Sequence, residues 1–225
     1  MTEKPTRPEV TESVRAALRR HVASRAAELQ KRYAADVASA RAELAALRGA
    51  AGAPIGSDPV AFAAVFAGAP ERLTGTSDDP SPAERAAHLA LTLFAVHHQS
   101  ADGHASHVAR RGLGRAIGAL ARPDDAESRE KPIMRRFAAL LTATELPEIA
   151  HHLRGVVQLL RADRDRGEAV ALDYGQLAVD LYDLQFPSAR DRVRLRWSRD
   201  ALDRRQAAAA PASDADATPH NTDHS

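Results

Sequence analysis

The sequence predicts an all-α protein made of two small helical bundles in series. Alanine and leucine dominate the 225 residues, β-branched residues are sparse, and no segment shows sustained alternation of apolar and polar residues. The chain contains no cysteine, so disulfides and thiolate metal sites are excluded. A chain of this length has enough core to fold without such cross-links. We therefore expect helix packing alone to stabilise the fold.

An N-terminal bundle is expected over residues 1–122, and it begins with a long helix. Apolar residues recur at helical spacing from about Thr11 to Arg48, with a bend near Tyr33 as the alternative to a straight helix. The segment "GAAGAPIGSDP" has the glycines and prolines of a loop. A short helix is expected after it, from Pro59 to Ala67.

The clearest start of a helix is "SPAE", at Ser81–Glu84. A capping serine, a proline at the first helical position and a glutamate at the third form a capping box. This helix should end near Ser100, and another is expected from about His104 to Ala121. The latter contains "RRGLGRAIGAL", whose three glycines have helical spacing and indicate close packing between helices. These glycines are Gly112, Gly114 and Gly118.

A charged segment, residues 122–131, separates the bundles, and we place the second bundle at 123–205. Its helices are expected in "IMRRFAALLTA", "LPEIAHHLRGVVQLLRADRD" and "DYGQLAVDLYDLQ", the last capped by Asp173. A final arginine-rich helix should follow Pro187, with Ser188 as its cap. Val193 and Trp197 would lie on its apolar side. The remaining segment, 206–225, lacks aromatic residues, and a disordered tail is expected there.

Basic residues are unevenly distributed, although the net charge is only +1. The stretch "SARDRVRLRWSR" places five arginines around the one tryptophan of the chain. Like charges at this density repel each other unless something neutralises them. Arginine suits bidentate contact with phosphate, but the excess of arginine over lysine is also typical of a GC-rich genome, and a charged helix face is often simply solvated.

No catalytic apparatus is visible in the sequence. The chain lacks a G-x-S-x-G elbow, a P-loop and a G-x-G-x-x-G loop. Four histidines lie within eleven residues, but they lack the acidic co-ligands of a zinc or di-iron site. These histidines are His97, His98, His104 and His107. In the pair His151–His152, one ring is expected to face the core and the other solvent. We therefore predict neither an enzyme nor a metal or other cofactor.

The chain is expected to be a cytoplasmic protein without membrane contact. Its N-terminus is polar and lacks the apolar core of a signal peptide. The longest nearly apolar run, Leu89 to Val96, is much shorter than the roughly 20 residues that cross a bilayer. The absence of cysteine fits a reducing compartment.

Several segments, in matching order and spacing, resemble the CasB-type small subunit of the type I-E CRISPR surveillance complex, Cascade. These segments are "ARAELAALR", the "GAPIG" loop, "LTLFAVHHQS", "GLGRAIGAL", "MRRFAALL", "LPEIAHHLRGVVQLLRA", "LDYGQLAVDLYDLQ" and "VRLRWSRD". The set covers about Asp36 to Asp200. Each segment alone is weak evidence, because helices rich in alanine, leucine and arginine look alike, but together the segments are specific.

The resemblance implies a non-catalytic, two-bundle subunit that contacts guide RNA, target DNA and the displaced DNA strand and so stabilises the R-loop in antiviral defence. It also implies contacts with the backbone and large subunits of the complex and with a second copy of itself. Carried over by position, the predicted nucleic-acid-binding residues are Arg41, Arg48, Arg115, Arg136, Arg194, Arg196 and Arg199. Trp197 is assigned to packing.

Two alternatives belong to other classes of protein. The first is a helical protein-interaction module or a regulator that binds duplex DNA. Such a regulator needs a recognition helix, and "TATELPEIAHHL" lacks arginine or asparagine at the start of its helix. The second is a small helical metalloprotein built on the histidines.

Overall fold

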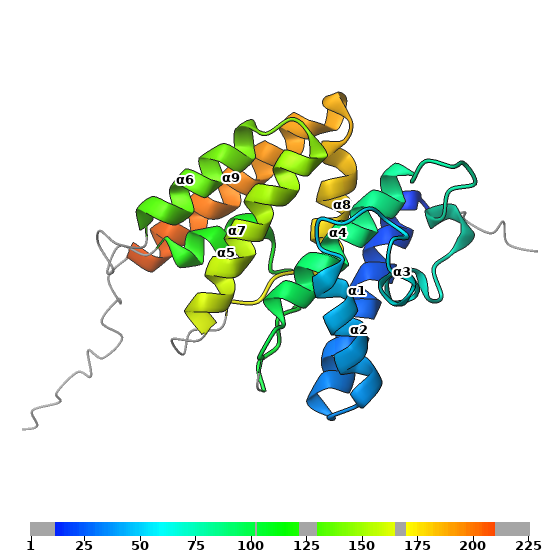
Figure 1. Cartoon of the computed structure of the whole chain (residues 1–225). Helices are drawn as coiled ribbons and strands as arrows, with labels where there is room; N and C mark the ends of the chain where they lie inside the picture. Colours follow the sequence, from blue (N-terminus) through cyan, green and yellow to red (C-terminus); the bar gives the residue numbers. More distant parts are fainter. Residues whose placement is uncertain (1–11, 102, 122–129, 165–169, 210–225) are drawn as a thin grey trace, which may run out of the picture.

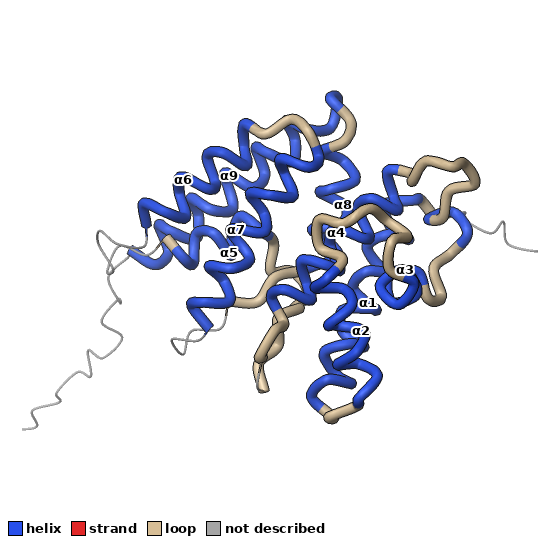
Figure 2. The backbone as a smooth tube through the Cα atoms, in the orientation of Figure 1, coloured by secondary structure: helices blue, strands red, loops and turns tan. Residues whose placement is uncertain are grey.

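The all-α fold is confirmed by a computed structural model that describes residues 12–101, 103–121, 130–164 and 170–209. Within these ranges the chain forms nine α-helices and a short 3-10 helix, η1, with no strand (Figures 1 and 2). In chain order they are α1 (Val14–Ala34), α2 (Ala38–Gly49), α3 (Pro59–Phe66), η1 (Glu71–Leu73), α4 (Pro82–His97), α5 (Leu113–Leu120), α6 (Glu130–Thr142), α7 (Leu146–Arg164), α8 (Tyr174–Leu184) and α9 (Pro187–Ala209).

The segment expected to be helical from Thr11 to Arg48 forms two helices, α1 and α2, which agrees with the alternative of a bend near Tyr33 rather than with one straight helix. The break lies at Asp36, whose φ of 59° is incompatible with a continuing right-handed helix. Ion pairs then hold the two helices together. Glu43 of α2 receives the guanidinium groups of Arg25, at 3.1 Å, and Arg32, at 2.6 Å, both from α1.

The central helix α4 begins with the predicted capping box. Ser81 Oγ accepts a hydrogen bond from the Glu84 backbone N–H at 3.2 Å, and Glu84 Oε2 accepts one from the Ser81 N–H at 2.6 Å. Nearly all of the helix after Glu84 is buried, because α1, α2, α7 and α8 all pack against it. Helix α4 thus forms the centre of the apolar core.

The prediction of a helix from His104 to Ala121 is wrong for the first half of that segment, since α5 begins only at Leu113. Residues 104–112 instead run beside the segment that precedes α8. Two hydrogen bonds join these two segments: Val108 N–H donates to the Leu172 carbonyl at 3.3 Å, and Leu172 N–H donates to the Ser106 carbonyl at 3.0 Å. These long-range bonds satisfy backbone groups that a helix would have satisfied locally.

Two glycines permit the closest contacts between helices. A Cβ at Gly114 of α5 would lie 2.3 Å from the backbone oxygen of Trp197 in α9. A Cβ at Gly175 of α8 would lie 2.6 Å from the backbone oxygen of Arg19 in α1. The prediction that glycines in "RRGLGRAIGAL" serve helix packing is therefore confirmed for Gly114.

Helices from the two halves of the sequence are interleaved in space. Helix α5 packs mainly on α9, and α8 packs on α1 and α4, so one continuous apolar core includes residues from both halves. Figure 1 shows α5, α6, α7 and α9 on one side of α8 and α1 to α4 on the other. The division into domains at residues 122 and 123 stays a prediction, and residues 122–129 lie outside the described residues.

The last helix confirms the helical interpretation of the arginine-rich stretch, but its ends differ from those expected. It begins at Pro187, so Ser188 lies inside the helix rather than at its cap. It continues to Ala209, so 206–209 is helical rather than part of a disordered tail, as the helix propensity of alanine favours. Residues 210–225 are outside the described ranges. Across the helices that are described, none is both long and apolar enough to pass through a bilayer.

Candidate nucleic-acid interface

Three arginines of the cluster in α9 make contacts within the protein. Arg190 Nε donates to the Leu184 carbonyl at the end of α8, at 3.1 Å. Arg194 Nη2 donates to the Ala143 carbonyl, just after α6, at 2.7 Å. Both side chains therefore cap carbonyl groups at helix C-termini, where the helix dipole also favours a cation.

The third arginine, Arg196, belongs to a buried network around Asp180 of α8. The Asp180 side chain is 2% exposed, and its Oδ1 accepts hydrogen bonds from Arg196 Nη2 at 2.5 Å and Gln176 Nε2 at 2.7 Å. Its Oδ2 accepts one from Trp197 Nε1 at 2.7 Å. Burial raises the pKa of Asp180, and the charge of Arg196 opposes that shift. The prediction that Trp197 packs in the core is confirmed, since it is 1% exposed.

The remaining two arginines of the cluster face solvent. Arg192 and Arg199 are exposed, and neither has an ion pair or hydrogen bond among the residues that the structure describes. They alternate with two leucines that are about half exposed, Leu195 at 50% and Leu202 at 53%. The outer face of α9 therefore carries cations that nothing in the described structure neutralises.

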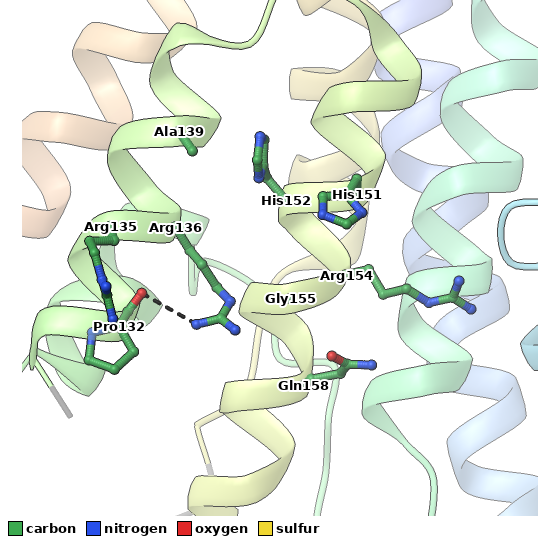
Figure 3. A pocket seen from close by; sticks show the side chains of 9 residues that line it. All are labelled: Pro132, Arg135, Arg136, Ala139, His151, His152, Arg154, Gly155 and Gln158. Carbon is green, nitrogen blue, oxygen red and sulfur yellow. Dashed lines mark hydrogen bonds between the residues drawn. The ribbon is translucent and has the colours of Figure 1, made fainter. Parts of the chain in front are cut away.

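A second basic surface lies between α6 and α7, and we call it the α6–α7 groove (Figure 3). It is a pocket of about 590 Å³. Its lining residues, none of them acidic, are Pro132, Arg135, Arg136, Ala139, His151, His152, Arg154, Gly155 and Gln158. Three arginines and two histidines thus line the groove, and the carboxylate of Glu148 lies 3.9 Å from His152 Nε2 at its edge. Guanidinium groups are suited to binding anions.

The shape of the groove depends on Gly155, which lies in the middle of α7. Arg136 extends from α6 toward this glycine, and a Cβ there would lie 2.8 Å from Arg136 Nε (Figure 3). The hydrogen bond of Arg136 to the Pro132 carbonyl is long, at 3.5 Å, so its guanidinium keeps donors for a ligand. Arg154 points away from α6, so α7 presents cations on two sides (Figure 3).

The other predicted arginines are distributed over two regions. Arg115 is exposed on α5, one residue after the glycine that contacts α9. Arg41, which is ion-paired with Asp36, and half-buried Arg48 both lie on α2. That helix packs mainly on α1, α3 and α4. The structure therefore does not unite all seven predicted residues in one surface, and their contacts with nucleic acid stay predictions.

Sequence reasoning missed several residues of these two surfaces. Arg154 was not singled out, and the expectation for the pair His151–His152 is met only in part, because His151 is exposed but His152 is half-buried rather than in the core. A glycine inside a strongly helical segment was the available signal, since it indicates a close approach by another group. Gly155 is such a glycine.

Of the four clustered histidines, His97, His98 and His107 are buried in the core, whereas His104 is exposed. His97 Nδ1 lies 3.0 Å from the hydroxyl of Tyr174, and His98 Nδ1 lies 3.0 Å from Ser106 Oγ. His107 Nδ1 accepts a hydrogen bond from the Tyr174 N–H at 3.2 Å, and burial lowers its pKa. Among the described residues, no three histidine or acidic side chains are grouped so that they could hold a metal ion.

Comparison with known proteins identifies a family and a solved structure that are similar to this chain. The model of the family described as CRISPR-associated protein Cse2 matches residues 43–200. The crystal structure of CasB from Thermobifida fusca is similar to this chain with a TM-score of 0.67 and 32% sequence identity. The match covers 82% of this chain and 97% of that one. Among curated proteins, none matches significantly.

Proposed function

Since the chain belongs to the CRISPR-associated Cse2 family, we propose that it is the non-catalytic small subunit of a type I-E Cascade complex and stabilises the R-loop by contacting nucleic-acid backbones. The single observation that carries the assignment of contacts is the α6–α7 groove, whose lining combines Arg135 and Arg136 of α6 with His151, His152 and Arg154 of α7 and includes no acidic residue. The exposed Arg192 and Arg199 of α9 form a second candidate contact.

The chemistry of the two surfaces favours phosphates over bases as the main ligand. Guanidinium groups bind phosphate oxygens through two parallel hydrogen bonds, and such contacts carry no sequence information. A subunit that holds any target sequence needs contacts of this kind. The net charge of +1 is too small for tight binding by the isolated protein, so neighbouring subunits would supply the rest of the binding surface.

The partners in this proposal follow from the family. They are the backbone and large subunits of Cascade, a second copy of this chain, guide RNA, and the target and displaced DNA strands. The regulator and the metalloprotein receive no support from a specific observation, because the basic groove lies between two helices and the buried His97 and His98 contact Tyr174 and Ser106.

The test is R-loop formation by reconstituted complexes that contain variants of this subunit. We expect Arg136→Glu with Arg154→Glu to weaken binding of matched target duplex by about tenfold or more, similarly for different sequences. Lys31→Glu is the control, because it reverses an exposed charge outside the groove and outside α9. Equal binding by the groove variant and the control, with both complexes fully assembled, would contradict the assignment of the groove.

A further inference from the structure

An apolar cleft borders the basic groove on the other side of α7, and we call it the α4–α7 cleft. It has a volume of about 660 Å³, within the range of about 300–1,000 Å³ typical of ligand sites. Its walls come from the loop after α2, from α4 and from the start of α7. The apolar side chains of these walls include Pro54, Ile55, Leu89, Leu93, Pro147 and Ala150.

The cleft and the groove are continuous, because His151 and Arg154 line both. Arg154 points away from α6, toward the cleft side of α7 (Figure 3). Arg85 also lines the cleft, and its Nε donates to Gln185 Oε1 at 3.1 Å. Arg85 and Arg154 therefore border an apolar cavity. This arrangement suits a ligand whose flat apolar ring enters the cavity while its anionic groups contact the two arginines.

A buried imidazole adds a polar group to this apolar lining. His88 of α4 lines the cleft, is only 7% exposed, and has no hydrogen-bond or ion-pair partner among the described residues. Burial lowers the pKa of this imidazole, so it is neutral at pH 7 and offers one donor and one acceptor. A purely apolar occupant would leave both nitrogens unsatisfied at a cost.

We propose that the α4–α7 cleft binds one unstacked nucleobase of a single strand whose phosphates lie along Arg154 and the α6–α7 groove. This proposal rests on the proposed function for the strand itself. The flat ring would contact the proline and leucine walls, and its polar edge would pair with His88. An apolar side chain of another subunit is the competing occupant, but it would not use the His88 nitrogens or the flanking arginines.

The experiment compares two single-stranded DNA 12-mers of equal charge, oligo-dT and the same strand with abasic sites, binding to the full-length chain at low salt. We expect the wild type to prefer the strand with bases by about tenfold. Ala150→Trp, which fills the cleft, should abolish that preference and leave the affinity for the abasic strand unchanged. His88→Phe keeps an apolar ring but removes both nitrogens, and it should reduce the preference.

The controls separate the failure of this inference from failure of the proposed function. Ala63→Trp adds the same ring at an exposed position of α3 and should behave as wild type, and thermal unfolding midpoints verify that each variant folds.

Arg136→Glu should weaken binding of both strands equally. Equal affinity of wild type for both strands would overturn the base site while leaving the groove intact. No effect of Arg136→Glu on either strand would overturn the groove and the base site together. If Ala150→Trp instead blocks assembly of the complex, the cleft is a protein docking surface.

Discussion

Trp197 donates its indole N–H to Asp180 at 2.7 Å, and both side chains are almost completely buried. This hydrogen bond joins α9 to α8 at the point where Gly114 of α5 meets the backbone of Trp197. Three helices therefore converge on a single residue. Trp197, at the centre of the arginine cluster, thus fixes the position of α9 on the protein.

Replacing Trp197 with alanine should lower the free energy of unfolding by about 3–5 kcal/mol, because it leaves a large cavity and removes a donor from Asp180. Denaturant unfolding measures this change. The control is Leu195→Ala in the same helix, which removes a side chain that is 50% exposed and should change stability by less than about 1 kcal/mol. Equal effects of the two substitutions would contradict the burial of Trp197.

Replacing Arg196 with glutamine should destabilise the protein more at pH 8 than at pH 4, by about 1–2 kcal/mol at the higher pH. Burial raises the pKa of Asp180, so the folded protein binds a proton more readily there than the unfolded chain does. Stability from this group is therefore lost as pH rises from the ordinary aspartate range through the raised pKa. Arg196 offsets that loss only while Asp180 is charged.

Urea unfolding of the wild type and Arg196→Gln across this pH range measures the difference. Adding Asp180→Asn to both proteins is the control, since asparagine does not titrate and the difference should then be independent of pH. A pH-independent difference in the presence of Asp180 would contradict the coupling.

Acid should destabilise the protein between pH 7 and pH 5 through its buried histidines. Burial lowers the pKa of His21, His88 and His107, so the folded state resists protonation while the unfolded state takes up protons near pH 6.5. Stability is then lost as pH falls through that value, by up to about 1.4 kcal/mol per pH unit for each histidine. His21→Gln retains a donor for the Val65 carbonyl, which His21 Nε2 contacts at 2.8 Å. Its midpoint of thermal unfolding should fall less over this range than that of the wild type.

Two glycine-to-alanine substitutions should have opposite consequences. At Gly114 the new Cβ meets the Trp197 backbone, which cannot move without shifting α9, so we expect a loss of about 1–3 kcal/mol. At Gly155 it meets only the flexible side chain of Arg136, so the gain in helix propensity should keep the fold stable. Displacement of the Arg136 guanidinium should nevertheless weaken DNA binding. Unfolding and gel-shift measurements on both variants separate these effects.

The arginines of α9 should divide into two groups on charge reversal. Arg192→Glu and Arg199→Glu should leave the unfolding midpoint unchanged but weaken R-loop formation in the complex. Arg194→Glu should instead lower the unfolding midpoint, because it places a negative charge at the C-terminal end of α6.

If the complex neutralises roughly five phosphates of a single strand, the logarithm of its binding constant should fall with the logarithm of salt concentration at a slope of about −3.5. A slope that is the same for the wild type and the Arg192/Arg199 double variant would assign this face to another role.

Local features of the fold were accessible from sequence because the contacts are local. The capping box at Ser81 and Glu84 joins residues three apart, and its prediction is confirmed. Residues 104–112 were misassigned because their partners lie more than sixty residues away, at Leu172 and Asp173. From the sequence, a bend near Tyr33 was only an alternative to a straight helix, because the break depends on a positive φ at Asp36, a residue other than glycine.

The candidate site was harder to predict for the same physical reason. Arg136 was chosen on its resemblance to a family position, but the groove also needs Arg154 and the absence of a side chain at Gly155. These residues lie on different helices, and only their packing brings them together. Conversely, the cluster in α9 looked like one surface, although Arg190, Arg194 and Arg196 all make internal contacts.

The packing of α5 on α9 also constrains how the protein folds during synthesis. When α5 leaves the ribosome, about seventy residues must still be translated before α9 follows it, which takes several seconds at roughly 5–20 residues per second. During that interval, Leu113, Ala116 and Ile117 lack the helix that covers them in the finished chain. Folding is therefore expected to be completed only after release of the last helix, and a nascent chain truncated before Pro187 should bind chaperones that recognise exposed apolar helices.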